Sequence, residues 1–539
     1  MKITAPAARA WQIHSDDGAF DHEIEGYASK TSVNVGEPIT FYVSVKVPQR
    51  YTMQIYRMGW YNGEGGKLYY TKTNIDGDTQ PFPYANQVTG LLECDWEEGE
   101  SWTPPENTVS GFFIVKLTAA LSGKQSYIVF VVRDDNRTPS SDFLFQSAVT
   151  TYQAYNDYPG NKSYLSDWQK GRSLYKNYSY GPNLPGIPPD GEADDQAREV
   201  SFNRPYNPQN RIYDSAGHFF ELEYNMVRWL EKDGYDVTYQ TDVDTHELPG
   251  TLAPGKHKAL LVVGHDEYWS WEMRDRVEKA RDHPTQPTHL GFFGGNNVHW
   301  QIRFKPSTAN SAPAGQSNRT IVAYKEHWRD PQPGAGIGDP NYKNNALNIN
   351  TDNHTITTLW RENKNSLVTG CSTGQLPNCN CPSDTPNCTK YPEDELVGVM
   401  TEIAPLIKGD FHFVLELGMP PWIRSGIPNT IRTLNNLVGY EADTYYNNYG
   451  RNVQIISSSQ IIHPDTQQLG VSNAVYYKLG NQARVFAIGS IRWSWGLDDF
   501  GQTNVYTNQP WKSPVRVNSY AQILTRNVIN CFAGFTACN

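Results

Sequence analysis

One stretch, residues 260–300, constrains the fold more than any other part of the chain. It contains two apolar runs, of which the first ends in GHDE at 264–267 and the second ends in GGNN at 294–297. Between them, residues 270–282 have the amphipathic spacing of a helix. Both runs are too apolar to have a solvent-exposed face, so we predict two buried parallel strands joined by a helix. Ligands of open α/β sheets bind beyond the carboxyl ends of the strands, where we therefore expect the function.

Composition narrows the class of protein. The chain has 539 residues, enough for two or three domains with buried cores. A net charge of −11 without a long basic run argues against a nucleic-acid partner. No apolar stretch approaches the roughly 18 residues that a membrane span needs. The first residues lack the apolar segment of a signal peptide, so such a peptide is absent or already removed.

Several features favour an extracellular protein. The chain is rich in Tyr, Trp, Asn, Gly and Pro, only 19% of it is charged, and it contains Asn-x-Ser/Thr triplets that fit a glycoprotein. Among seven cysteines, Cys531 and Cys538 are expected to form a disulfide that pins the tail. Four more lie between 371 and 388, without the paired spacing of common zinc sites, so disulfides are favoured over zinc. Cys94 is expected to be a buried, unreactive thiol.

The pattern of apolar residues divides the chain into two parts. Over residues 1–136, short alternating runs separated by Gly, Asn and Pro predict an immunoglobulin-like β-sandwich. Over residues 137–539, strand-like and helix-like runs alternate, which predicts a mostly parallel, doubly wound α/β domain. Residues 304–410 have the pattern of a long, irregular insertion that carries the cysteine cluster.

His265 and Glu267 are the first candidates for chemistry. They lie two residues apart at the end of a predicted strand, where they could supply a metal ligand and an acid or base. The alternative is structural. Acidic residues just before a helix stabilise its N-terminus, and Ser270 is a plausible N-cap.

The GGNN turn is the second candidate. A sharp glycine turn after a buried strand resembles the nucleophile elbow of α/β hydrolases, but its tip carries Asn296 rather than Ser or Cys. Asparagine cannot attack a carbonyl group, although it can donate a hydrogen bond to a substrate oxygen. Hydrolysis would then need an activated water, for which a metal ion is the obvious agent. The alternative is a turn chosen only for its left-handed backbone.

Tyrosines supply a third group of candidates. Several phenols follow the first predicted α/β strand, within residues 150–158, and Tyr164 and Tyr175 come soon after. A phenolate is a hard, anionic oxygen donor that suits Fe³⁺. The alternative is aromatic packing in a tyrosine-rich chain. Glu441, in a polar loop, could be a general base or simply a solvated carboxylate.

Seven separated motifs occur together in one order. They are TYQAYN (151–156), SFNRPY (201–206), MVRWLEKDGYDV (226–237), VVGHDEYWS (262–270), FFGGNNVHW (292–300), VGYEAD (438–443) and GSIRWSWGLDDF (489–500). In this order and context, the chain resembles the large, catalytic subunit of N,N-dimethylformamidase and its relatives. The resemblance extends from Phe143 to the C-terminus, apart from the insertion.

The resemblance implies a glutamine-amidotransferase-like α/β domain that carries one iron ion, as Fe³⁺, held by two tyrosines and one glutamate. Carried over by motif, Glu267 matches the glutamate ligand and Tyr155 the first tyrosine ligand. His265 matches a histidine that contacts the metal ligands without binding the metal itself. Asn296 matches an asparagine that faces the substrate, and Glu441 an acidic residue that acts as a base.

The second tyrosine ligand has two candidates. Relatives often have GGKSLY soon after the first motif, and here PGNKSY (159–164) puts Tyr164 at the matching distance. The sequence Ser-Leu-Tyr of the relatives' motif, however, is found in this chain at residues 173–175 and ends at Tyr175. Tyr164 is favoured, with Tyr175 as the alternative.

These inferences predict a mononuclear iron amide hydrolase that cleaves the C–N bond of a small amide or formamide through a metal-activated water. A small partner subunit or a homo-oligomer fits the resemblance. The alternative is a non-catalytic extracellular binding or structural protein that keeps the same fold. The two differ in geometry, since only the enzyme needs Tyr155, a second tyrosine and Glu267 to converge on one point.

Overall fold

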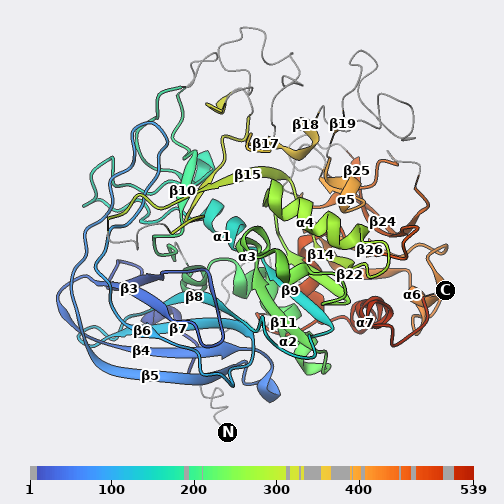
Figure 1. The fold of residues 1–539 in the computed structure, drawn as a ribbon, viewed down its shortest axis with the longest axis horizontal. Coiled ribbons are helices and arrows are strands. Elements are labelled where there is room, and N and C mark those ends of the chain that lie inside the picture. The colour runs from blue at the N-terminus through green and yellow to red at the C-terminus, as the bar shows by residue number, and fades with distance from the viewer. Residues whose placement is uncertain are drawn as a thin grey trace.

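The structure is a computed structural model. It describes residues 9–186, 193–208, 211–310, 316–326, 329–332, 354–365, 389–390, 392–401, 407–447, 451–462, 469–501 and 515–538. Two adjoining parts make up the fold, an N-terminal part built from strands and a larger part around a seven-stranded sheet (Figure 1).

The N-terminal part consists of two sheets that enclose an apolar core. The larger sheet has the order β2 (Ser32–Asn34), β8 (Gln125–Arg133), β7 (Gly111–Ala119), β4 (Gln49–Met58) and β5 (Gly66–Gly77). The smaller sheet has the order β1 (Ile24–Ala28), β3 (Ile39–Val45) and β6 (Ser101–Trp102). Phe41, Ile55 and Phe113 pack in the core between them. The immunoglobulin-like assignment and the boundary at residue 136 stay predictions.

The seven-stranded sheet organises the larger part. Its order is β11 (Val237–Thr241), β9 (Phe143–Ser147), β12 (Ala259–Gly264), β14 (His289–Gly294), β26 (Arg484–Ala487), β25 (Leu469–Lys478) and β24 (Val453–Ile462). The first five strands are parallel, β25 runs antiparallel to β26, and β24 runs antiparallel to β25. Across the sheet from β11 to β26, these five parallel strands come second, first, third, fourth and fifth in the chain. The direction of winding therefore reverses between β9 and β12, where open α/β sheets bind their ligands.

Helices cover both faces of this sheet (Figure 1). The helices α2 (Tyr224–Lys232) and α7 (Ser519–Ala533) share one apolar core with strand residues such as Leu261, and α4 (Trp271–Asp282) shares another with residues such as Leu260. Ser270 caps α4, because its hydroxyl accepts a hydrogen bond from the amide of Met273. The glutamine-amidotransferase-like assignment stays a prediction.

Smaller elements surround the sheet. A second, five-stranded sheet is made of β10 (Glu199–Ser201), β13 (Tyr268–Ser270), β15 (Trp300–Lys305), β16 (Thr320–Val322) and β17 (Thr358–Leu359). The described residues also form three two-stranded sheets, β18 (Lys364–Asn365) with β19 (Thr389–Lys390), β20 (Met400–Thr401) with β23 (Asp443–Thr444), and β21 (Ile407–Val414) with β22 (Thr433–Tyr440). The short helices are α1 (Val149–Tyr155), α3 (Asp242–Glu247), α5 (Glu393–Leu396) and α6 (Pro421–Arg424).

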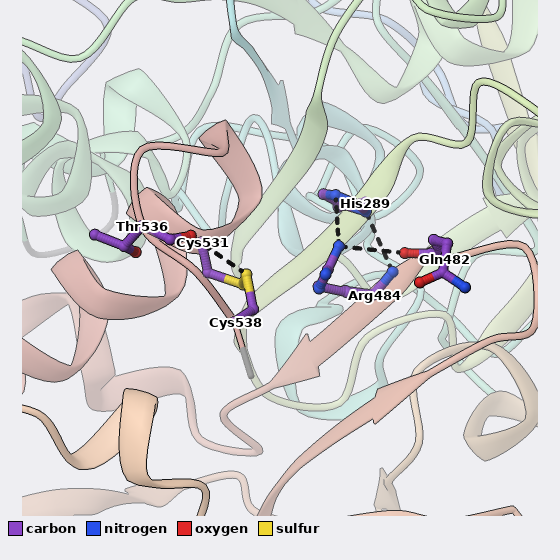
Figure 2. Close-up of a disulfide and its surroundings, with 6 residues drawn as sticks. All are labelled: His289, Gln482, Arg484, Cys531, Thr536 and Cys538. Carbon is purple, nitrogen blue, oxygen red and sulfur yellow. Dashed lines mark hydrogen bonds between the residues drawn. A yellow bond between two sulfur atoms is a disulfide. The ribbon is translucent and has the colours of Figure 1, made fainter.

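The cysteine predictions have different outcomes. The disulfide Cys531–Cys538 is present and ties the chain end back to α7 (Figure 2), and Cys94 is fully buried. The four cysteines between 371 and 388 lie outside the described residues. Among the described helices, none is both long and apolar enough to cross a bilayer.

Candidate metal centre

The candidate site lies at the carboxyl ends of β9, β12 and β14. The helix α1 follows β9 and ends at Tyr155, whereas residues 265–267 follow β12 and residues 295–297 follow β14. The last residues of the two neighbouring strands, Gly264 and Gly294, pair in register. A Cβ atom on Gly294 would lie 2.1 Å from the carbonyl oxygen of Gly264. Glycine at 294 is therefore required for the two strand ends to approach this closely.

Three oxygen-bearing side chains converge here. The hydroxyl of Tyr175 lies 2.9 Å from Oε1 and 2.9 Å from Oε2 of Glu267. The hydroxyl of Tyr155 lies 3.2 Å from Oε2 of the same carboxylate. The rings of the two tyrosines stack with their centroids 4.4 Å apart. Two phenols and one carboxylate thus meet at a single buried point.

The structure places Tyr164 away from the other predicted ligands, which favours the alternative Tyr175. That side chain is 52% exposed, and its hydroxyl donates to Asp21 of the N-terminal part at 3.1 Å. Tyr175 instead takes the place beside Tyr155, because the preceding residue Leu174 is fully buried and its amide donates to Ala154 at 2.9 Å. Distance along the chain favoured Tyr164, but the loop between the motifs first runs outward and only the Ser-Leu-Tyr segment returns.

The spacing of these oxygens fits a bound metal ion. Two oxygens bound at about 2.0 to 2.1 Å from one ion, at angles between octahedral and tetrahedral, lie about 2.8 to 3.4 Å apart. The separations of 2.9 to 3.2 Å between the phenols and Glu267 fall in that range. Hard anionic oxygens suit Fe³⁺. Within the described ranges, no group of three or more His, Cys, Asp or Glu side chains is arranged to hold a metal, so a centre here depends on the tyrosines.

Burial and nearby charges set the protonation of the phenols and of Glu267. Burial, together with the charge of Glu267, raises the pKa of the Tyr175 phenol far above its usual range. The phenol therefore keeps its proton unless a strongly acidic cation replaces it. Burial opposes ionisation of Glu267, but His265 outweighs it and lowers the pKa of this carboxyl to about 2.

His265 lies between two carboxylates. Its Nε2 atom is 3.2 Å from Oε2 of Glu267 and 3.6 Å from Oε2 of Glu441, and its Nδ1 atom is 3.0 Å from the carbonyl of Gly295. Burial would lower the pKa of His265, but Glu441 and Glu267 raise it to about 10. Burial raises the pKa of Glu441. The three predicted residues therefore form one buried charged cluster.

Asn296 occupies the tip of the glycine turn. Its backbone is left-handed, with φ of 51°, and its amide N–H donates to Asp443 at 2.9 Å. Its side-chain nitrogen lies 3.5 Å from Oε1 of Glu267, and its side-chain oxygen has no partner in the described part of the chain. The turn brings the side-chain amide to the metal candidate, where its nitrogen contacts Glu267 and its oxygen is open to a ligand.

Three further residues contact the ligand set. The hydroxyl of Tyr268 donates to that of Tyr175 at 2.6 Å, and the indole N–H of Trp300 donates to Glu267 at 2.9 Å. The ammonium of Lys325 lies 3.3 Å from the centroid of the Tyr175 ring. Tyr268 and Trp300 stand inside the recognised motifs and could have been singled out from the sequence. Lys325 comes from the predicted insertion, where no sequence signal marked it.

His218 is a fourth neighbour that the sequence did not indicate. Its ring centroid is 5.3 Å from that of Tyr155, and its buried Nδ1 atom has no partner among the described residues. Burial and the nearby His265 lower the pKa of His218 to about 3, so its imidazole is neutral. It can therefore accept or donate one hydrogen bond without changing the charge of the site.

Some solved structures show only weak similarity to the chain. The alkylpurine DNA glycosylase AlkC of Pseudomonas fluorescens is 13% identical, covers 22% of this chain and 32% of its own, and has a TM-score of 0.14. A lytic polysaccharide monooxygenase from Streptomyces lividans is 16% identical, covers 19% of this chain and 58% of its own, and has a TM-score of 0.13.

Sequence relatives are more informative. The N,N-dimethylformamidase beta subunit of an Alcaligenes species is 24% identical over 259 residues, which are 44% of this chain and 33% of that relative. The match thus spans about a third of the relative's length. A family profile described as N,N-dimethylformamidase beta subunit-like, C-terminal, matches residues 52–508. Because the profile covers most of the chain, the protein belongs to the N,N-dimethylformamidase beta subunit-like family.

Proposed function

We propose that this protein is a mononuclear iron amide hydrolase that cleaves the C–N bond of a small amide or formamide. The observation that carries the proposal is the convergence of Tyr155, Tyr175 and Glu267 at distances of 2.9 to 3.2 Å. The family supports amide hydrolysis and suggests the class of substrate. We further propose that this chain is the catalytic type of subunit, since it carries all three candidate ligands.

Tyr155, Tyr175 and Glu267 would hold the iron, as Fe³⁺. When bound, such an ion polarises a carbonyl group and lowers the pKa of a coordinated water. The surrounding residues orient these ligands. Trp300 fixes one oxygen of Glu267, and Tyr268 fixes the hydroxyl of Tyr175. Such outer contacts commonly determine how well a site retains its metal.

The remaining residues suit proton transfer and substrate binding. Asn296 donates its side-chain N–H to the substrate carbonyl oxygen. Glu441 takes a proton from the attacking water at Oε2, an atom that has no hydrogen-bond partner within the described ranges. His265 holds Glu441 and Glu267 in place through Nε2.

Water and the amide are the only reactants that this hydrolysis consumes. The water oxygen forms a bond to the carbonyl carbon, and its proton passes to Glu441. When the C–N bond breaks, the leaving nitrogen takes that proton, so that Glu441 returns to its starting state. The products are a carboxylic acid and an amine.

The competing proposal is a binding or structural protein that has lost the chemistry. It predicts that the three candidate ligands do not meet, because nothing would retain their geometry. Their close approach, together with the burial of His265 and Glu441, favours the hydrolase.

The test is metal analysis combined with an activity screen. Protein purified without added metal should contain close to one iron per chain and release amine from N,N-dimethylformamide, formamide or acetamide. Glu267→Ala should lose both iron and activity. A wild-type protein that lacks iron after expression in iron-rich medium would refute the proposal, as would a Glu267→Ala variant with full activity. Assays and molar-mass measurements on the chain alone also test the proposed homo-oligomer or small partner subunit.

A further inference from the structure

A cavity lined by three cationic side chains lies away from the metal candidate. It is small, with a volume of about 30 Å³, opens to solvent, and lies between strands β1 and β8 of the N-terminal part and helix α1 with its neighbouring loops. Its lining includes Lys30, Arg204 and Arg319 but no aspartate or glutamate. Three cations without a carboxylate are unexpected in a chain whose net charge is −11.

Two of these cations are buried without a counter-ion. Arg204 is 1% exposed and Arg319 is 5% exposed, and neither forms an ion pair with a carboxylate of the described residues. Several other buried arginines do pair with an acid, as Arg228 does with Asp498 at 2.6 Å. Because burying an unpaired charge is costly, a missing anion is a physical reason for this arrangement.

Arg204 and Arg319 are held by neutral groups instead. Arg204 donates to Gln153 Oε1 at 2.9 Å, and Arg319 donates to Asn203 Oδ1 at 2.9 Å and to the Ala28 carbonyl at 2.8 Å. Burial lowers the pKa of each guanidinium to about 10, so both stay charged near neutral pH. The two positive charges are therefore positioned but not neutralised.

Two polar groups of the cavity lining have no protein partner. The Nη1 atom of Arg319 donates to no acceptor of the described chain, because the hydrogen bonds of this side chain come from Nε and Nη2. The hydroxyl of Tyr206 also has no hydrogen-bond partner among the described residues. A guanidinium N–H beside a phenolic hydroxyl offers two hydrogen-bond donors, one of them charged, to an oxyanion.

We propose that this cavity binds a small oxyanion, either inorganic phosphate or a carboxylate such as formate, between Arg319, Arg204 and Tyr206. Because β1 and β8 form one wall and the loops of the larger part form the other, the anion also stabilises the junction between the two parts. The proposal stands on the cavity and its charges alone and does not depend on the proposed hydrolase.

The test is anion binding to the purified full-length protein, measured by calorimetry and by thermal unfolding at constant ionic strength set with sodium chloride. Titration with sodium phosphate, and separately with sodium formate, should give saturable binding and a rise in the unfolding temperature for at least one of them. A response to phosphate alone identifies an inorganic anion, and a response to formate identifies a carboxylate.

Variants distinguish this cavity from the metal candidate. Arg319→Gln should weaken binding about tenfold or more. Tyr206→Phe should also weaken it, while it leaves folding intact because that hydroxyl has no protein partner. Arg526→Gln, which removes a surface arginine paired with Asp233, is the matched control and should bind as the wild type does. The absence of saturable binding for both anions, or binding unchanged in Arg319→Gln and Tyr206→Phe, overturns the proposal.

Discussion

The hydroxyl of Tyr175 lies 2.9 Å from each carboxylate oxygen of Glu267, although 92 residues separate them in the chain. The strand order explains the approach. Glu267 follows β12, and Tyr175 is anchored to α1, which follows β9, on the two sides of the point where the winding of the sheet reverses. Residues that are distant in sequence are thus brought to one sheet edge.

Lys325 should influence how tightly the metal is held. Its ammonium lies 3.3 Å from the centroid of the Tyr175 ring, where a positive charge stabilises the aromatic face and a developing phenolate. We predict that Lys325→Met weakens iron retention between about twofold and thirtyfold, the range that such contacts contribute. Competition with a chelator measures this. Lys305→Met, at a partly exposed lysine paired with Glu199, is the control and should not change retention. Equal retention in Lys325→Met would refute the role.

Glu441 should affect the reaction more than the metal. We predict that Glu441→Gln lowers kcat about a hundredfold or more, because the amide cannot take up the proton of the attacking water. Iron content should stay at the wild-type level, since Glu441 is not among the three proposed ligands. Steady-state kinetics alongside metal analysis separate the two effects. A variant that loses iron as Glu267→Ala does would show that Glu441 belongs to the metal site itself.

Gly294 should be intolerant of any side chain. A Cβ atom at this position would lie 2.1 Å from the backbone of Gly264, so that β12 and β14 would have to separate. We predict that Gly294→Ala lowers the free energy of unfolding by about 3 kcal/mol or more. Gly250→Ala is the matched control, because an added Cβ there meets nothing within 4 Å. Urea unfolding of both variants measures the difference, and equal stability would contradict the close approach of the two strand ends.

The buried carboxyl of Glu223 should make stability depend on pH. Burial raises the pKa of this group to about 8, although Ser147 and the Ala148 amide donate to it. Between its ordinary pKa of 4.5 and about 8, the folded protein keeps a proton that the unfolded chain releases. The contribution of Glu223 to stability therefore falls as pH rises through this window.

We accordingly predict that Glu223→Gln flattens the decline in unfolding free energy between about pH 5 and about pH 8, because glutamine does not titrate. Urea unfolding across this range measures the slope. Glu64→Gln, at an exposed position, is the control. If Glu223→Gln retains the wild-type slope, the carboxyl does not hold its proton in the folded protein.

Much of the fold follows directly from sequence patterns. The two apolar runs within residues 259–294 form β12 and β14, and the spacing at 270–282 forms α4. These agreements have one cause. In each element, apolar residues recur in the sequence with the spacing of the face that the element buries. The local sequence pattern and the tertiary packing therefore favour the same structure.

Other features depend on contacts that no local pattern encodes. The phenols within residues 150–158 were expected only to follow a strand, but two of them, Tyr152 and Tyr155, lie on the short, mostly buried helix α1. Tyr164 was preferred over Tyr175 because only spacing was available, and the return of the chain depends on buried Leu174. Lys325 and Arg319 belong to a segment that looked irregular, and they acquire their roles only where β16 joins the second sheet.

The most direct test of the account compares Tyr175→Phe with Tyr164→Phe. Both variants remove one phenolic hydroxyl, but the first lies beside Glu267 and the second is exposed and bonded to Asp21. The account predicts that wild-type protein shows a visible tyrosinate-to-iron absorption band and that Tyr164→Phe keeps both band and iron. It predicts that Tyr175→Phe loses most of the band and binds less iron. An unchanged band and iron content in Tyr175→Phe, or loss of both in Tyr164→Phe, would contradict the proposed centre.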